Sequence, residues 1–217
     1  MKVIFPWDDG IDINMLRKDY EKFFVVFPKE VSKLGLSRHI SITNSKSNSK
    51  RYLPFIKIEY WNSRVNYSFI DIFPTDYVTD VVPNLKSFHR KECLSYIDRL
   101  RAGEKRQVAL NESFQKLHVS KDETDILMTG VEDPIFGFVT DKNKVFPLKT
   151  MKFENREYYC PNDYMDYVKK LYGGDYIRIP KTAHSHNFME YIASHDNIYE
   201  NFEKSIETMR NVNDNFE

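Results

Sequence analysis

Apolar and polar residues alternate along the chain directly after an acidic N-terminal segment. In the stretch GIDINM, Ile11 and Ile13 flank Asp12, and this period of two predicts a short strand. The next stretch, MLRKDYEKFFVVFPKEV, repeats its apolar residues at helical spacing, so that those from Leu16 to Phe24 share one face. The chain is therefore expected to begin with a strand followed by a helix.

Two β-prone segments follow in the first half of the sequence. RYLPFIKIEYW and NYSFIDIFP are separated by the turn residues NSR, which indicates a hairpin or two adjacent strands. Before them, the polar stretch SITNSKSNSK (41–50) is rich in turn-forming residues and predicts a solvated loop.

The second half combines helical patterns with short β-prone runs. Residues 84–117 are charged and helical in pattern, with Gly103 as the expected break between two amphipathic helices and the run KSFHRK on a solvated face. The segment EDPIFGFVTDKNKVFPLKTMKFENREYYCP predicts small hairpins, with DKNK as a turn. A helix is expected after residues 161–163, ending at Gly173 and Gly174, and another from about residue 187 to 209. This mixture favours an α+β or α/β fold in a single domain.

Composition directs the search for function to local sites. The 217 residues are 41% hydrophobic, enough for one core, and 32 basic residues balance 32 acidic ones. No overall field therefore recruits nucleic acid. Cys93 and Cys160 match no metal-binding or redox spacing, which predicts structural roles in a reducing compartment. The sequence contains no apolar run long enough to span a bilayer and no secretory h-region in MKVIFPWDD, so we expect a cytoplasmic protein.

Carboxylates are the candidate chemical groups. Asp8, Asp9 and Asp12 lie close together, and two carboxylates two residues apart on a strand can bind one hard cation such as Mg²⁺. In YSFIDIFPTD, Asp71 stands among apolar residues, where an uncompensated charge is costly, so we expect a partner, of which a metal is one option. The alternative is an acidic turn with helix-capping residues, with Asp71 capping the turn at the end of its strand.

Three segments in this order resemble the LicD family, the bacterial phosphocholine transferases related to fukutin. They are FPWDDGIDINMLRKDYEKF, which contains an Arg-x-x-Tyr pair (Arg17 and Tyr20), then FIDIFPTDYV, and finally VFPLKTMKFENREYYCPNDYMDYVKKLYGGDYIRIP. The resemblance covers about Phe5 to Pro180, followed by a helical tail at 181–217. It implies a nucleotidyltransferase-like mixed sheet flanked by helices. It also implies that Mg²⁺ or Mn²⁺ assists transfer of a phospho-substituent, typically phosphocholine from CDP-choline, onto a sugar of a cell-surface glycan or teichoic acid precursor, with peripheral membrane association as an option.

The resemblance also assigns roles to individual residues. Asp9, Asp12 and Asp71 are the implied metal ligands, and Asp12 and Asp71 are the implied catalytic carboxylates, one of which takes the proton of the acceptor hydroxyl. Lys57 would neutralise a donor phosphate, the alternative being a solvent-facing strand lysine. Asp76 would either assist Asp71 or cap the following turn.

Three aromatic residues are candidates for binding the choline cation or the acceptor sugar by stacking. They are Tyr60, Trp61 and Tyr67, and the alternation along their strands also places at least one of them in the core.

The sequence departs from the family pattern at two points. Where the family has a third acidic residue before the Ile-Asp-Ile strand, this chain has Gly10. The family's Gly-rich segment, which precedes that strand and holds the donor phosphates, has no counterpart in the sequence. Both departures predict weaker phosphate and metal binding, so the alternative function is a catalytically impaired LicD-like protein or a module that binds a glycan or a protein partner.

Overall fold

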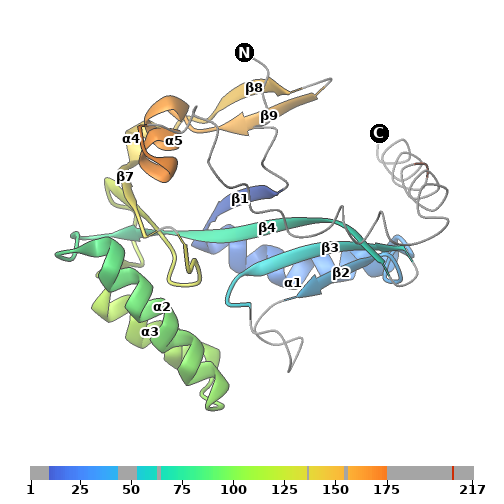
Figure 1. Ribbon diagram of the computed structural model, residues 1–217, viewed down its shortest axis with the longest axis horizontal. Helices are drawn as coiled ribbons and strands as arrows, with labels where there is room; N and C mark the ends of the chain where they lie inside the picture. The colour runs from blue at the N-terminus through green and yellow to red at the C-terminus, as the bar shows by residue number, and fades with distance from the viewer. Residues whose placement is uncertain are drawn as a thin grey trace.

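The computed structural model describes residues 10–43, 53–62, 65–135, 137–153, 156–174 and 207, and these residues form a mixed α+β fold (Figure 1). The strands of the main sheet are β1 (Ile11–Leu16), β2 (Ile40–Thr43), β3 (Ile56–Asn62), β4 (Val65–Val78), β5 (Val119–Ser120), β6 (Ile126–Thr129) and β7 (Val139–Asp141). A separate two-stranded sheet contains β8 (Lys149–Phe153) and β9 (Arg156–Cys160). The helices are α1 (Arg17–Lys33), α2 (Leu85–Arg101), α3 (Arg106–Lys116), α4 (Lys142–Val145) and α5 (Tyr164–Tyr172).

The long strand β4 organises the main sheet. The sheet has the order β2-β3-β4-β6-β7, and β4 pairs antiparallel with β3, β5 and β6. Strand β1 pairs with β4 in the parallel direction, in a register that places Ile11 beside Ile70 and Leu16 beside Thr75. Strand β4 therefore pairs both with the N-terminal strand β1 and with strands from the middle of the chain.

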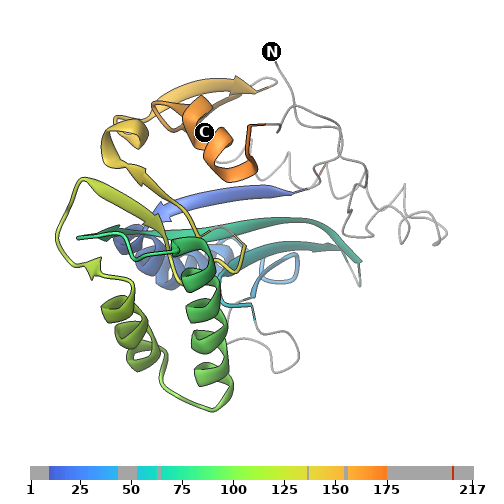
Figure 2. The same ribbon diagram turned by 60° about the vertical axis from the view of Figure 1, so that its left-hand side comes forward.

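Helices α1, α2 and α3 cover one face of this sheet, here called the helix face (Figures 1 and 2). Ile70 and Ile72 of β4 pack with Tyr20 of α1, and Val78, further along the same face of β4, packs with Tyr96 of α2. Residues two apart on a strand share a face, so these contacts assign alternate β4 residues to the core. Burial also raises the pKa of the Cys93 thiol in α2 to about 12, which agrees with a structural role for this cysteine.

The opposite face of the sheet, here called the cavity face, carries Asp71 and Thr75 of β4. The small sheet β8–β9 lies over this face together with α4 and α5 (Figures 1 and 2). The site described below lies between these two layers.

The structure confirms most of the expected elements in the described residues. The first strand and helix are present, although the helix begins at Arg17, and α2 and α3 are separated at Gly103, whose φ is +89°. Helix α5 begins after Asp163, whose side chain accepts a hydrogen bond from the N–H of Asp166. Its backbone ends at Gly173, as expected. The expected C-terminal helix at 187–209 lies outside the described residues, apart from one position.

Two local expectations are wrong. Residues 41–43, expected in a loop, belong to β2, because they pair with β3 and Thr43 donates a hydrogen bond to Glu59 at 2.9 Å. The DKNK segment is not a hairpin turn: its aspartate ends β7 and its other three residues belong to α4. Two carbonyl groups of α4 accept hydrogen bonds from the N–H groups of Asn162 and Asp163, contacts that local turn propensity does not reveal.

The expected solvated face of α2 contains a buried histidine. His89, within the KSFHRK run, is 1% exposed, and its Nε2 lies 3.0 Å from the carbonyl oxygens of Thr129 and Gly130. Its ring therefore connects the start of α2 to the end of β6.

None of the helices in the described ranges is both long enough and apolar enough to cross a membrane.

Candidate functional site

Two candidate carboxylates are adjacent on the cavity face of the sheet. In the parallel register of β1 and β4, Asp12 lies beside Asp71. Both strands contain the sequence Ile-Asp-Ile, and the flanking isoleucines are also paired residue by residue. Register partners project to the same face, so the two carboxylates lie side by side, Asp12 exposed and Asp71 with 13% of its side chain exposed.

Lys57 of β3 adds a positive charge on the other side of Asp71. Its Nζ lies 2.7 Å from Oδ1 of Asp71 and 3.7 Å from the centre of the Phe69 ring. Its side chain is only 13% exposed, so the solvent-facing alternative is wrong. Lys57, Asp71 and Asp12 therefore form a row across β3, β4 and β1, with one cation and two anions.

An irregularity in the β3–β4 hairpin determines which residue of β3 lies beside Asp71. The register between β3 and β4 shifts between Tyr60 and Trp61. Near the turn, Trp61 pairs with Asn66. If that register continued along both strands without the shift, Lys57 would lie opposite Ile70 and not opposite Asp71. The irregularity therefore aligns the lysine with the carboxylate.

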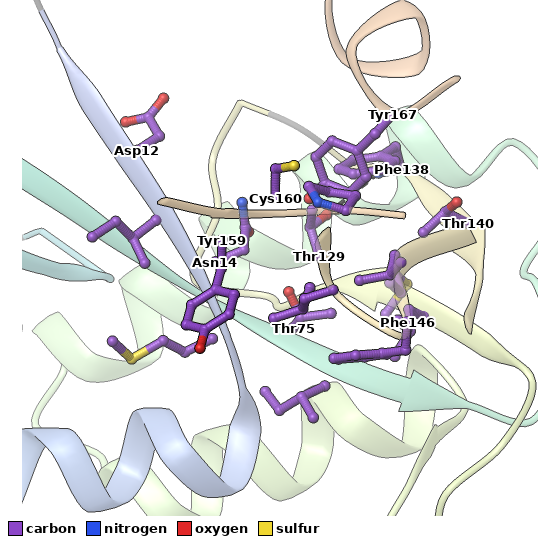
Figure 3. Close-up of a pocket in the computed structure, with 18 of the residues that line it drawn as sticks. Asp12, Asn14, Thr75, Thr129, Phe138, Thr140, Phe146, Tyr159, Cys160 and Tyr167 are labelled. Atoms are coloured by element: carbon purple, nitrogen blue, oxygen red, sulfur yellow. Dashed lines mark hydrogen bonds between the residues drawn. The ribbon is translucent and has the colours of Figure 1, made fainter. Parts of the chain in front are cut away.

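A cavity of about 570 Å³ lies between the main sheet and the β8–β9 layer, and Asp12 is the member of this row that lines it (Figure 3). Its apolar and aromatic lining includes Met15, Leu16, Leu127, Phe138, Val145, Phe146, Leu148, Tyr159 and Tyr167. Four neutral polar side chains, Asn14, Thr75, Thr129 and Thr140, also line it. Among its described lining residues the only charged side chains are those of Asp12 and Asp19, so the cavity disfavours an anionic group.

Figure 3 shows how these side chains are arranged. Asp12 lies at one end, on β1, whereas Thr140 and Phe146 lie toward the other end. Tyr159 of β9 lies near Asn14, so the small sheet contributes an aromatic ring close to β1. Cys160, expected to be structural, also lines the cavity.

Two aromatic residues of the cavity lining are in contact with each other. The rings of Phe138 and Tyr167 meet edge to face, with 5.1 Å between their centres. Burial raises the pKa of Tyr167, so its hydroxyl stays protonated at neutral pH.

Asp76 does not assist Asp71. The two are five residues apart on one strand and so project to opposite faces. On the helix face, Arg17 donates two hydrogen bonds to Asp76, at 2.8 and 2.7 Å, and two to Glu132, at 2.6 and 2.8 Å. Arg17 directly follows β1, so this buried cluster holds the end of the Asp12 strand against β4.

A second arginine extends the cluster. Arg106 of α3 donates to Glu21 of α1 at 2.9 and 2.6 Å and reaches Glu132 at 3.3 Å. Burial by itself would raise the pKa of the Glu132 carboxyl, but Arg17 and Arg106 outweigh it and hold that pKa below its usual value. Sequence reasoning missed Arg106 and Glu132, which lie in segments with no distinguishing motif.

One of the three candidate aromatic residues lies in the core, as the alternation along the strands predicted. Tyr60 is 8% exposed and lies in the core on the helix face. It is three residues from Lys57 on β3, so the two side chains project to opposite faces of the sheet. It therefore cannot stack on a ligand in the cavity. The side chains of Trp61 and Tyr67 lie outside the described part of the structure, whereas Tyr159 and Phe146 contribute rings to the cavity itself.

The two aligned carboxylates fit a divalent metal of the magnesium class. Hard oxygen donors on adjacent strands suit Mg²⁺, which commonly binds one or two protein carboxylates and completes its coordination with water and phosphate oxygens. Within the described ranges no three His, Cys, Asp or Glu side chains form a metal-binding group, and Asp9 lies outside them. Of the three ligands that the resemblance implies, the structure describes Asp12 and Asp71.

Comparison of the chain with protein-family models, with curated proteins and with solved structures finds no match.

Proposed function

We propose that the chain is a LicD-like transferase that moves a phospho-substituent, typically phosphocholine from CDP-choline, onto a sugar of a cell-surface glycan or teichoic acid precursor. The observation that carries this proposal is the alignment of Asp12, which lines one end of the cavity, with Asp71 on the neighbouring strand. The parallel β1–β4 pair that aligns them supports the finer assignment of a nucleotidyltransferase-like fold.

The residues divide the chemistry between them. Asp12 and Asp71 would hold Mg²⁺ or Mn²⁺, which, when bound, supplies positive charge to the donor phosphates. Lys57, beside Asp71, supplies a further cation for a phosphate. A carboxylate oxygen that does not hold the metal would accept the proton of the acceptor hydroxyl, and Asp12 is the more accessible of the two carboxylates.

The lining of the cavity supports a neutral or cationic substituent on the donor. Quaternary ammonium groups bind to aromatic faces, and rings from Phe138, Phe146 and Tyr159 line the cavity. Acidic side chains carry the only charges among its described lining residues, which also favours a cation. Choline meets both requirements.

A catalytically impaired protein is the second candidate, and one observation favours it. The Lys57 ammonium already contacts the Asp71 oxygen that a metal would need, so a fixed side-chain cation can satisfy this carboxylate. In that case the fold would bind a glycan or a protein partner through the cavity, and divalent metals would have no effect.

A thermal-shift titration with Mn²⁺ or Mg²⁺, with and without CDP-choline, tests the proposal. At a ligand concentration of about 100 times Kd, binding stabilises the native state by about 2.7 kcal/mol. For a chain of this length that corresponds to a rise in Tm of roughly 5–11 °C. The Asp12→Asn variant should lose the metal-dependent rise, because it removes one ligand charge without changing the side-chain shape.

Asp19→Asn is the matched control, because Asp19 also lines the cavity but is not aligned with Asp71. It should keep the metal response. If the wild-type protein shows no metal response and no transfer of phosphocholine to a sugar acceptor, the second candidate function replaces the first.

A further inference from the structure

Lys57 is placed to compete with a metal, and not only to assist one. Its ammonium lies 2.7 Å from Oδ1 of Asp71, and the exposed fraction of each of the two side chains is 13%. The Phe69 ring, 3.7 Å from the ammonium, covers it on another side. Lys57 is therefore held at the carboxylate by an ion pair, by an aromatic ring and by the register of β3 against β4.

Two cations cannot share one carboxylate without mutual repulsion. A divalent ion on Asp12 and Asp71 would lie within a few ångströms of the ammonium, in a region partly shielded from water where repulsion is only weakly screened. The metal must therefore either bind weakly or displace Lys57. A donor phosphate offers Lys57 another anion to pair with.

We propose that Lys57 is a resident counter-ion that keeps metal affinity low until a phosphate-bearing donor attracts the ammonium away from Asp71. The inference rests on the proposed function and adds a mode of regulation to it. Metal and donor then bind cooperatively, because each is favoured by the same movement of one side chain. By thermodynamic linkage, the donor strengthens metal binding by the same factor as the metal strengthens donor binding.

The first experiment measures Mn²⁺ affinity by isothermal titration calorimetry without any nucleotide. Lys57→Met should bind Mn²⁺ about tenfold tighter than the wild type or better, because it removes a unit positive charge next to the ligand while keeping the length of the side chain. Lys57→Arg keeps the charge and should stay within about twofold of the wild type.

Two further variants test the location of the effect. Lys33→Met removes a lysine from the exposed end of α1, where it pairs with Glu30, and should leave Mn²⁺ affinity unchanged. Adding Asp12→Asn to Lys57→Met should abolish the gain in affinity, because the metal then lacks one of its two carboxylates. Urea denaturation establishes that each variant is folded, and Lys57→Gln replaces Lys57→Met if the latter does not fold.

The second experiment repeats the titration at saturating CDP-choline, after correction for Mn²⁺ bound by the free nucleotide. CDP-choline should tighten Mn²⁺ binding in the wild type and do so markedly less in Lys57→Met. Equal Mn²⁺ affinities of wild type and Lys57→Met would overturn the inference while leaving the proposed function in place. If neither protein binds Mn²⁺, with or without CDP-choline, the metal site fails and both proposals fail with it.

Discussion

The replacement of Arg17 by methionine should destabilise the protein more than any change to a surface charge. Arg17 makes paired hydrogen bonds to two carboxylates, Asp76 and Glu132, whose side chains are 1% and 0% exposed. Methionine fills much of the same space but deprives both Asp76 and Glu132 of this guanidinium, and the contact from Arg106 to Glu132 that remains is longer, at 3.3 Å. Removing one partner of a buried ion pair typically costs about 3–5 kcal/mol.

Urea denaturation followed by circular dichroism measures this loss directly. The free energy of unfolding of Arg17→Met should fall by about 3–5 kcal/mol, whereas Lys33→Met, which removes an exposed pair with Glu30, should change it by less than about 0.5 kcal/mol. Adding Asp76→Asn to Arg17→Met should restore part of the loss, because the unpaired charge is then removed.

Two results would refute this reasoning. One is a loss below about 1 kcal/mol for Arg17→Met, which would mean that the buried carboxylates do not depend on this guanidinium. The other is a similar loss for Lys33→Met, which would mean that the burial of an ion pair does not determine how much stability is lost when one partner is removed.

The remaining predictions concern His89 and Gly130. Burial lowers the pKa of His89, so its stabilising contribution is complete above about pH 6.5 and is lost as the pH falls toward the folded-state pKa. Between about pH 7 and pH 5.5 the wild type should lose up to about 1.4 kcal/mol more stability than His89→Gln in urea denaturation, and equal losses would contradict this assignment. A Cβ at Gly130 would lie 2.6 Å from Cγ of Pro74 and 2.7 Å from Nη2 of Arg17, so Gly130→Ala should lower Tm by roughly 2–12 °C in a thermal melt. Gly174→Ala is the control, because within the described residues its Cβ would meet no atom within 4 Å other than those of its chain neighbours, and an equal Tm for both variants would contradict the steric argument.

The alternation of residues predicted the strands of the site but not their partners. Ile-Asp-Ile in β1 and again in β4 indicates which side of each strand is polar, and the structure places both aspartates on one face. A period of two does not specify which strand pairs with which. Nor does it reveal the irregularity near Tyr60 that aligns Lys57 with Asp71.

The cavity and the arginine cluster were beyond sequence reasoning for a different reason. The cavity is lined by residues from β1, α1, β4, β6, β7, α4, β9 and α5, so no local motif identifies it. Asp76 looked like a second carboxylate for Asp71 because the two are close in sequence. Its true partner, Arg17, is distant in sequence and follows a different strand.

The ion pair Lys57–Asp71 and the register pair Asp12–Asp71 differ in how far apart along the chain their residues lie, and this difference predicts an order of assembly during folding. Lys57 and Asp71 belong to one antiparallel hairpin, so their contact closes a short loop. Asp12 reaches Asp71 only when β1 docks in parallel from a distant part of the chain, which closes a much longer loop. We therefore expect the lysine to neutralise Asp71 before the second carboxylate arrives, so that β1 docks without meeting an unscreened negative charge.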